Sequence, residues 1–354
     1  MTINLGKVRS KRPVFFMLIF VCILSTSVIS NSGIFNAPQV SAATTYTYTI
    51  SVEGSNYVAR NTAGTLITSS TDFGTVFNAI NAKLVSGNTV SIKAGTYLVS
   101  TGAKLTKTNI AITGDPTNPS STTVRAASKS TPTNYLFQMG GSYNTIQGIT
   151  FDANKNTVIS PQFYLLGSYN TVKNNRFINA LQYNLETSNA DHFQILDNYA
   201  TNSQYGIATM GFNSWSTNGL ISGNTITDCQ SAGIKIRNAL DVVVENNYID
   251  TAYVQYIERY SYHSNEGMTG LYLSVSDGPS VNITFQNNRV IDSKENKITR
   301  GVFMENQNTA YWLSLTSVRM SNIKFLNNYF SGLYYSIITT GSFNTLQANT
   351  IILR

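Results

Sequence analysis

The stretch Val244-Glu-Asn-Asn-Tyr-Ile249 decides the fold, because its pattern recurs along the chain. Each copy contains a pair of residues that ends in Asn. An apolar residue stands two positions before the pair, and another apolar residue usually stands two positions after that Asn. The pair ends at Asn175, Asn198, Asn224, Asn247, Asn288, Asn328 and Asn349. Successive copies therefore lie 23, 26, 23, 41, 40 and 21 residues apart.

This spacing is typical of a solenoid of β-strands. Steps in the low twenties suit one turn of a three-strand coil, and the two long steps indicate one turn plus an insertion of roughly 15 to 20 residues. Helical solenoids have longer periods and apolar residues three and four apart, and β-propellers have about twice this period. The sequence thus predicts an all-β fold, a single-stranded right-handed parallel β-helix, with loop insertions at about 251–269 and 306–319.

The recurring Asn has a structural explanation. A coil must bend sharply between strands, and Asn tolerates the left-handed backbone conformation that such a bend requires. Asn side chains at the same place in successive coils can also form a ladder of hydrogen bonds. We therefore interpret these residues as part of the scaffold and not as ligand contacts.

A second type of strand precedes the Asn phrases, as in Gly206-Ile-Ala-Thr-Met210 and Gly233-Ile-Lys-Ile-Arg237. Side chains alternate between the two faces of a strand, so the residue after the first apolar one should point out of the coil. In register, one outward row reads Glu186, Ala208, Lys235, Tyr272 and Phe303. A second row, two residues further along, reads Ser188, Met210, Arg237, Ser274 and Glu305.

The two ends of the coil region differ from each other. Ser70-Thr71-Asp72 can begin a short helix, at about 70–84, whose apolar side chains recur at helical spacing. A helix there would cover the open edge of the first coil, which we expect to begin at Thr89. No comparable cap follows the last repeat. A partner, a minimal turn or self-association through the C-terminal end would have to protect it.

The first 42 residues have the pattern of a secretory signal peptide. Basic residues at 7–12 precede an apolar run from Val14 to Leu24, and Val40-Ser41-Ala42 supplies small residues before a cleavage site. The alternative is an uncleaved membrane anchor. In both cases we expect residues 43–354 to form one β-helix domain that is secreted, extracellular or at the cell surface.

Charge and cysteine content narrow the classes of partner. Four of the 24 Lys and Arg residues, and none of the 17 Asp and Glu residues, lie in this leader, so the remainder carries only +3. This balance supports neither a nucleic-acid partner nor a membrane surface, and it is compatible with an acidic polysaccharide. Cys229 is the one cysteine after the leader, so no internal disulfide can form there.

The capping helix, the phrase Val90-Ser-Ile-Lys-Ala-Gly-Thr-Tyr97 and the Asn coils together resemble the pectate-lyase-like superfamily over roughly residues 46–354. The resemblance implies a parallel β-helix that acts on or binds an extracellular polysaccharide. It leaves the activity open, because the superfamily contains lyases, epimerases, glycoside hydrolases and non-catalytic surface proteins. The Asp-Pro-His-Asp motif of alginate epimerases is missing. The paired aspartates and Gly-His-Gly motif of polygalacturonases are missing too.

The outward rows bring together residue types that suit β-elimination on a uronic acid. That reaction requires neutralisation of the carboxylate, a base for the C5 proton and an acid for the leaving oxygen. Arg237 would bind the carboxylate, Lys235 would be the base if desolvation or Arg237 favours its neutral form, and Tyr272 would be the acid. The competing interpretation is a solvated strand whose charges pair with Glu186 and Glu305 at the borders.

The first predicted insertion supplies further candidates, because long loops on a rigid coil often carry binding residues. Arg259 and His263 would supplement the acid–base set. Six aromatic side chains would either stack on sugar rings or pack within the loops: Tyr253, Tyr256, Tyr260, Tyr262, Trp215 and Trp312.

The sequence leaves three functions open. The first is a lyase for a uronate polymer, and the second is a non-catalytic carbohydrate-binding or matrix protein. The third, a glycoside hydrolase, requires two carboxylates across one bond, whereas Glu186 and Glu305 should lie four coils apart, about 19 Å. No cofactor is certain. Ca²⁺, common among pectate lyases, is compatible with Asp228, Asp250 and Asp292, which follow Asn turns without forming one acidic row.

Overall fold

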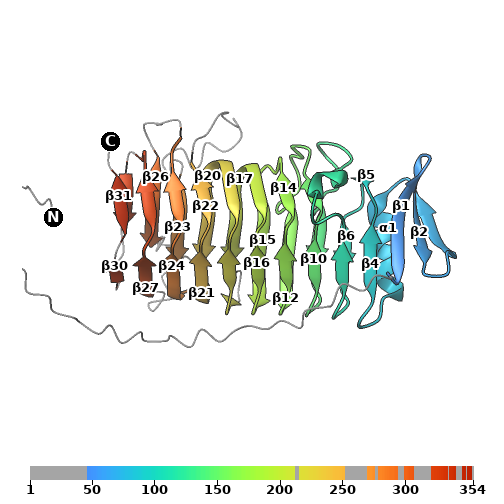
Figure 1. The fold of residues 1–354 in the computed structure, drawn as a ribbon, viewed down its shortest axis with the longest axis horizontal. Helices are drawn as coiled ribbons and strands as arrows, with labels where there is room; N and C mark the ends of the chain where they lie inside the picture. Colours follow the sequence, from blue (N-terminus) through green and yellow to red (C-terminus); the bar gives the residue numbers. More distant parts are fainter. Residues whose placement is uncertain are drawn as a thin grey trace, which may run out of the picture. The chain divides into compact units, whose positions relative to one another are not determined.

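The computed structural model describes residues 46–211, 215–251, 269–275, 278–293, 299–306, 320–333, 335–339, 345–347 and 349–352 (Figure 1). All of them belong to one compact unit, Ala37–Arg354. The predicted signal peptide lies outside the described residues, as does most of both predicted insertions.

The strands form three parallel flanks, and each complete coil contributes one strand to each flank (Figure 1). The first flank consists of β1 (Tyr48–Glu53), β4 (Thr89–Ile92), β7 (Ala111–Thr113), β10 (Thr145–Gln147), β13 (Thr171–Lys173), β16 (Gln194–Leu196), β19 (Leu220–Ser222), β21 (Ala239–Glu245), β24 (Ser280–Gln286), β27 (Met320–Leu326) and β30 (Thr345–Gln347). The short β18 (Ser216–Thr217) pairs with β21.

The second flank consists of β5 (Gly95–Val99), β8 (Thr122–Ala126), β11 (Thr150–Asp152), β14 (Arg176–Ile178), β22 (Tyr248–Asp250), β25 (Arg289–Ile291), β28 (Tyr329–Ser331) and β31 (Thr350–Ile352). The third flank consists of β6 (Ala103–Leu105), β9 (Phe137–Met139), β12 (Phe163–Ser168), β15 (Tyr183–Asp191), β23 (Thr269–Val275), β26 (Arg300–Asn306) and β29 (Tyr335–Thr339). Two long strands, β17 (Tyr199–Met210) and β20 (Thr225–Arg237), bend from the second flank into the third.

This architecture confirms the predicted parallel β-helix. Its interior is filled by the inward residues of the three flanks, which are fully or almost fully buried. Aromatic side chains stack between successive coils, with ring centroids 5.4 Å apart for Phe151 and Phe177 and 4.9 Å apart for Phe285 and Phe325. Burial of each such side chain contributes about 1.5 to 3 kcal/mol to folding.

The N-terminal end contains both an expected and an unexpected element. Helix α1 (Phe73–Lys83) is the predicted cap, and the Asp72 carboxylate accepts a hydrogen bond from the Thr75 backbone NH at its N-terminus. Before α1, strands β1, β2 (Asn56–Asn61) and β3 (Leu66–Ser70) form an antiparallel meander that was not predicted. β1 then joins the first coil by pairing in parallel with β4. Within the described residues, no helix has the length and hydropathy needed to cross a membrane.

The predicted asparagine ladder is present and continuous. The side-chain oxygen of Asn247 accepts hydrogen bonds from the backbone NH and the side-chain amide of Asn224, at 2.9 and 3.0 Å. The Asn247 amide in turn donates to the Ile221 carbonyl and to the Asn288 side chain, both at 3.0 Å. The same contacts link all seven residues from Asn175 to Asn349. The six ladder residues from Asn175 to Asn328 are almost fully buried.

The sequence predicts that one Asn both forms the backbone bend and joins the ladder, but in the structure two adjacent residues share these roles. In the six pairs from Asn174-Asn175 to Asn327-Asn328, the left-handed backbone belongs to the first residue, as at Asn174, Gly223 and Asn246, with φ of 51°, 70° and 55°. The second residue forms the ladder. Consequently the first position accepts Asn, Asp or Gly, whereas the second requires an amide that both donates and accepts.

This division predicts opposite outcomes for two adjacent asparagines. Asn247→Ala leaves buried backbone and amide groups of the neighbouring coils without partners, so the free energy of unfolding should fall by roughly 2 to 4 kcal/mol. Asn246→Gly, at an exposed left-handed position, should change it by less than about 0.5 kcal/mol. Urea unfolding of the two variants measures both values. Equal destabilisation would contradict the ladder as a source of stability.

Candidate functional site

The outward row predicted on the third flank is present in register. Glu186 pairs with Ala208, Ala208 with Lys235, Lys235 with Tyr272, and Tyr272 with Phe303. The inward neighbours Ile234 and Ile236 are fully buried in the coil interior. Towards the N-terminal end the same row continues through Tyr164, Gln138 and Lys104.

The second row is also in register over most of its length. Met210 pairs with Arg237, Arg237 with Ser274, and Ser274 with Glu305. Ser188 lies one residue beyond the stretch in which β15 pairs with β17, which ends at Thr187. The two rows therefore place Arg237 two residues along the strand from Lys235, on the same side of the sheet.

Lys235 lies between two tyrosine rings. Its Nζ atom is 4.5 Å from the ring centroid of Tyr205 and 4.7 Å from that of Tyr272, and it is 3.4 Å from the Tyr205 hydroxyl. Lys235 is only 4% exposed. The interpretation of a fully solvated strand is therefore wrong for this lysine, whose charge is stabilised by the ring faces instead of by water.

The stack continues on both sides of the lysine. The Tyr183 ring stacks on Tyr205, with centroids 4.9 Å apart, and the Phe303 ring stacks on Tyr272, with centroids 5.3 Å apart. We call Tyr183, Tyr205, Lys235, Tyr272 and Phe303 the lysine–tyrosine cluster. Its aromatic members pack with Ala208, Met210 and Ala232 in a small apolar cluster that is separate from the coil interior.

Tyr183 and Tyr205 were not among the predicted site residues. Both precede the predicted strands, at the corner where the chain enters the third flank, so strict alternation did not indicate which way their side chains point. The sequence does contain a signal, since Gln182-Tyr183 and Gln204-Tyr205 repeat one coil apart and the two tyrosines pair directly.

Glu186 lies in the same outward row as Lys235, two strand pairings towards the N-terminal end. Burial raises the pKa of its carboxyl from 4.5 to about 7, although the positive charges of Arg237 and Lys235 act in the opposite direction. The carboxyl lines a cavity of about 360 Å³ together with Tyr164, Pro161 and the segment 133–135. Near neutral pH the group is therefore divided between its protonated and ionised forms, as suits a proton donor or acceptor.

The remaining predicted residues are distributed as follows. Trp215 is 44% exposed, and Gly278 lies against its indole ring beside Asn238, the residue that follows Arg237. Glu305 is in β26 at the predicted place in the second row. Outside the described residues lie Tyr253, Tyr256, Arg259, Tyr260, Tyr262, His263 and Trp312.

The described residues contain no group of three or more His, Cys, Asp or Glu side chains that could hold a metal ion. Asp250 pairs with Thr227 on one side and Ile291 on the other, so no row of carboxylates forms there.

These features define a parallel β-helix protein with a lysine–tyrosine cluster on one flank. The family model described as "Right handed beta helix region" matches residues 164–351, and the chain belongs to this family. No curated protein sequence matches the chain.

Several solved structures are similar to this chain. An alginate lyase from Paenibacillus sp. str. FPU-7 is 14% identical, with a TM-score of 0.53 over 78% of this chain and 93% of that one. Pectate lyase Pel9A is 17% identical, with a TM-score of 0.45 over 77% and 73%. ORF18 of Geobacillus virus E2 is 13% identical, with a TM-score of 0.46 over 77% of this chain and 57% of its own length. The likeness to the alginate lyase, whose TM-score exceeds 0.5, agrees with the parallel β-helix fold of this chain.

The raised pKa of Glu186 predicts a pH-dependent stability. The folded protein holds this proton more tightly than the unfolded chain, so folding takes up a proton between pH 4.5 and about 7, and stability falls as pH rises through that window. Glu186→Gln removes the effect. The variant should match the wild type near pH 4 and exceed it at pH 8 by up to about 3 kcal/mol. Unfolding midpoints across this pH range provide the measurement, and an equal difference at both ends would contradict the assignment.

Proposed function

We propose that the protein is a secreted lyase that cleaves a uronic-acid-containing polysaccharide by β-elimination. One observation carries the proposal: an outward-facing lysine amine lies 3.4 Å from a tyrosine hydroxyl, with an arginine two residues along the same strand. This set contains a candidate base, a candidate acid and a candidate partner for the sugar carboxylate. Secretion rests on the pattern of the first 42 residues.

The roles follow from the chemistry of each group. Arg237 pairs with the sugar carboxylate and so makes the C5 proton easier to remove. Lys235 takes that proton when its amine is neutral, a form that burial favours and the two ring faces oppose; the C4–O bond then breaks, and a C4=C5 double bond forms. A phenol protonates the departing oxygen. Tyr205 is a stronger candidate for this role than Tyr272, because its hydroxyl lies 3.4 Å from the amine.

Glu186 fits this scheme as a substrate-binding residue. An ionised carboxylate would repel a uronate polymer, but burial keeps a large share of this carboxyl protonated near pH 7. A protonated carboxyl donates one hydrogen bond and accepts others, which suits sugar hydroxyl groups. Trp215, which is exposed and lies near Asn238 just past the end of the Arg237 strand, is proposed as a stacking platform.

A second candidate function is a non-catalytic carbohydrate-binding β-helix. The burial of Lys235 favours it, because an amine that is 4% exposed and held between two rings also suits a purely structural cation–π stack. A lyase requires the polymer to reach this amine.

The described residues support a glycoside hydrolase less well than a lyase. Retaining and inverting enzymes hold two carboxyl groups roughly 5 to 9.5 Å apart. Glu186 and Glu305 belong to different rows, and four strand pairings separate their coils, which corresponds to about 19 Å.

The lyase predicts a specific product and a specific loss. Purified protein mixed with pectate, alginate or a glycosaminoglycan should generate ultraviolet absorbance from unsaturated sugar ends with at least one of them. Lys235→Met and Tyr205→Phe should each reduce the rate by at least about 100-fold, since acid–base groups contribute 10² to 10⁴. Lys173→Met, which removes a lysine from the first flank, serves as the matched control and should retain full activity.

Two outcomes would count against the lyase. Wild-type protein that binds a uronate polymer without producing absorbance supports the non-catalytic alternative. Turnover that survives Lys235→Met in a folded variant would remove this lysine from the mechanism.

A further inference from the structure

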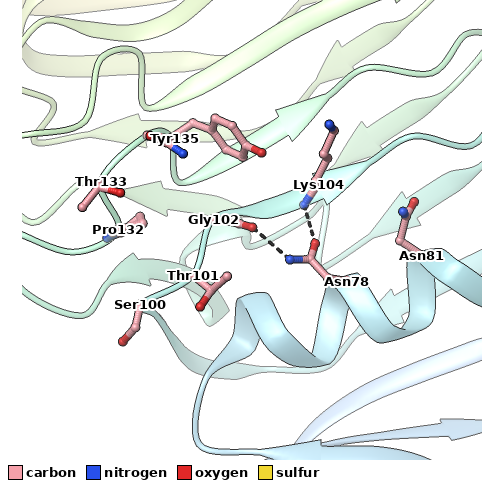
Figure 2. Close-up of a pocket in the computed structure, with 10 residues that line it drawn as sticks. Asn78, Asn81, Ser100, Thr101, Gly102, Lys104, Pro132, Thr133 and Tyr135 are labelled. Carbon is pink, nitrogen blue, oxygen red and sulfur yellow. Dashed lines mark hydrogen bonds between the residues drawn. The ribbon is translucent and has the colours of Figure 1, made fainter.

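A second cavity, of about 550 Å³, lies at the N-terminal end of the third flank (Figure 2). Its walls are α1, the residues that lead into β6 and the segment 132–135. The last three residues of that segment also border the cavity that contains Glu186, so the segment separates the two. The proposed reaction uses none of the groups in this second cavity.

One wall is fixed by side chains of α1. The Asn78 side-chain oxygen accepts from the Lys104 backbone NH at 2.8 Å, and its amide donates to the Gly102 carbonyl at 3.1 Å (Figure 2). The Asn81 side-chain oxygen accepts from the Thr106 backbone NH, and its amide donates to the Thr106 hydroxyl, both at 3.0 Å. These bonds tie both amides to the backbone around β6 and keep the wall rigid, and each amide retains a second N–H and a second lone pair for a ligand.

The opposite side presents an aromatic ring. Figure 2 shows the Tyr135 side chain extending over the strand towards Lys104. Gly102 makes room for it, because a Cβ atom at position 102 would lie 2.8 Å from the Tyr135 carbonyl oxygen and 2.9 Å from its ring. The ring is half-buried, and its position is set by a glycine that no larger residue could replace without moving it.

Small polar groups complete the cavity. In the described structure, no hydrogen bond engages the side-chain hydroxyls of Thr101, Thr133 and Tyr135. Of the ten residues that line the cavity, Lys104 alone is charged, and it is exposed. A fixed ring with hydroxyl and amide groups around it, without a carboxylate or a guanidinium, matches the donors, acceptors and apolar faces of an uncharged sugar.

We propose that this cavity binds uncharged sugar residues of an extracellular glycan. It is a site separate from the lysine–tyrosine cluster. Five strand pairings lead from Lys104 to Lys235, which corresponds to about 24 Å along the flank. The two sites can thus hold different stretches of one polymer, and the proposal does not depend on whether the protein is a lyase.

Titration calorimetry with neutral hexasaccharides (cello-, manno-, xylo- and laminari-oligosaccharides) and with oligogalacturonate tests the proposal on the full protein. At least one neutral oligosaccharide should bind. Tyr135→Ala should weaken this binding at least tenfold, and Thr133→Val, at an exposed position, should weaken it about threefold. Tyr143→Asn is the matched control, because it removes an exposed ring elsewhere and suits the left-handed backbone there, so affinity should not change.

Lys104→Met and Lys235→Met separate this site from its alternatives. Neutral-sugar affinity that persists in both variants and falls in Tyr135→Ala supports the proposal. Binding of oligogalacturonate alone, lost in Lys104→Met, would show an anion site and overturn it. Absence of binding by every neutral oligosaccharide would overturn it too, whereas loss of lyase activity with neutral binding intact would affect only the proposed function.

Discussion

The buried asparagine ladder is the constraint on which the rest of the structure depends. Each ladder residue satisfies the backbone of the preceding coil and the side chain of its neighbour, so a coil displaced by one residue would leave buried polar groups without partners. Since side chains alternate along a strand, such a displacement would also turn every outward residue inward. The ladder on one side of the coil thus helps to fix which side chains meet on the third flank.

The sequence was sufficient to predict the fold. The spacing of the Asn phrases gave the coil, and the apolar spacing after Asp72 gave α1, because both patterns follow directly from local geometry. The antiparallel meander before α1 escaped prediction, since β2 and β3 belong to no repeat and their pairing is specific to this end of the chain.

The site was predictable in part. Alternation and register placed Lys235 beside Tyr272 and Arg237 beside Ser274, as found. Tyr205 was missed because it lies at a corner, where period-two reasoning fails, and yet its hydroxyl lies 3.4 Å from the lysine amine. The burial of Lys235 and the raised pKa of Glu186 depend on how distant segments cover the flank, which no local pattern encodes. The cavity beside α1 was missed for the same reason, because it requires residues of three separate segments.

The register of the third flank is the central claim, and an engineered cross-link tests it most directly. In a Cys229→Ser background, Ala208→Cys and Lys235→Cys should form a disulfide in high yield after oxidation, because directly paired residues on adjacent strands lie within the Cα separation that a disulfide spans. Mass spectrometry of the linked peptides gives the yield. Ala208→Cys combined with Ile236→Cys, one residue out of register and facing the interior, should not cross-link. Efficient cross-linking of the second pair in place of the first would contradict the account.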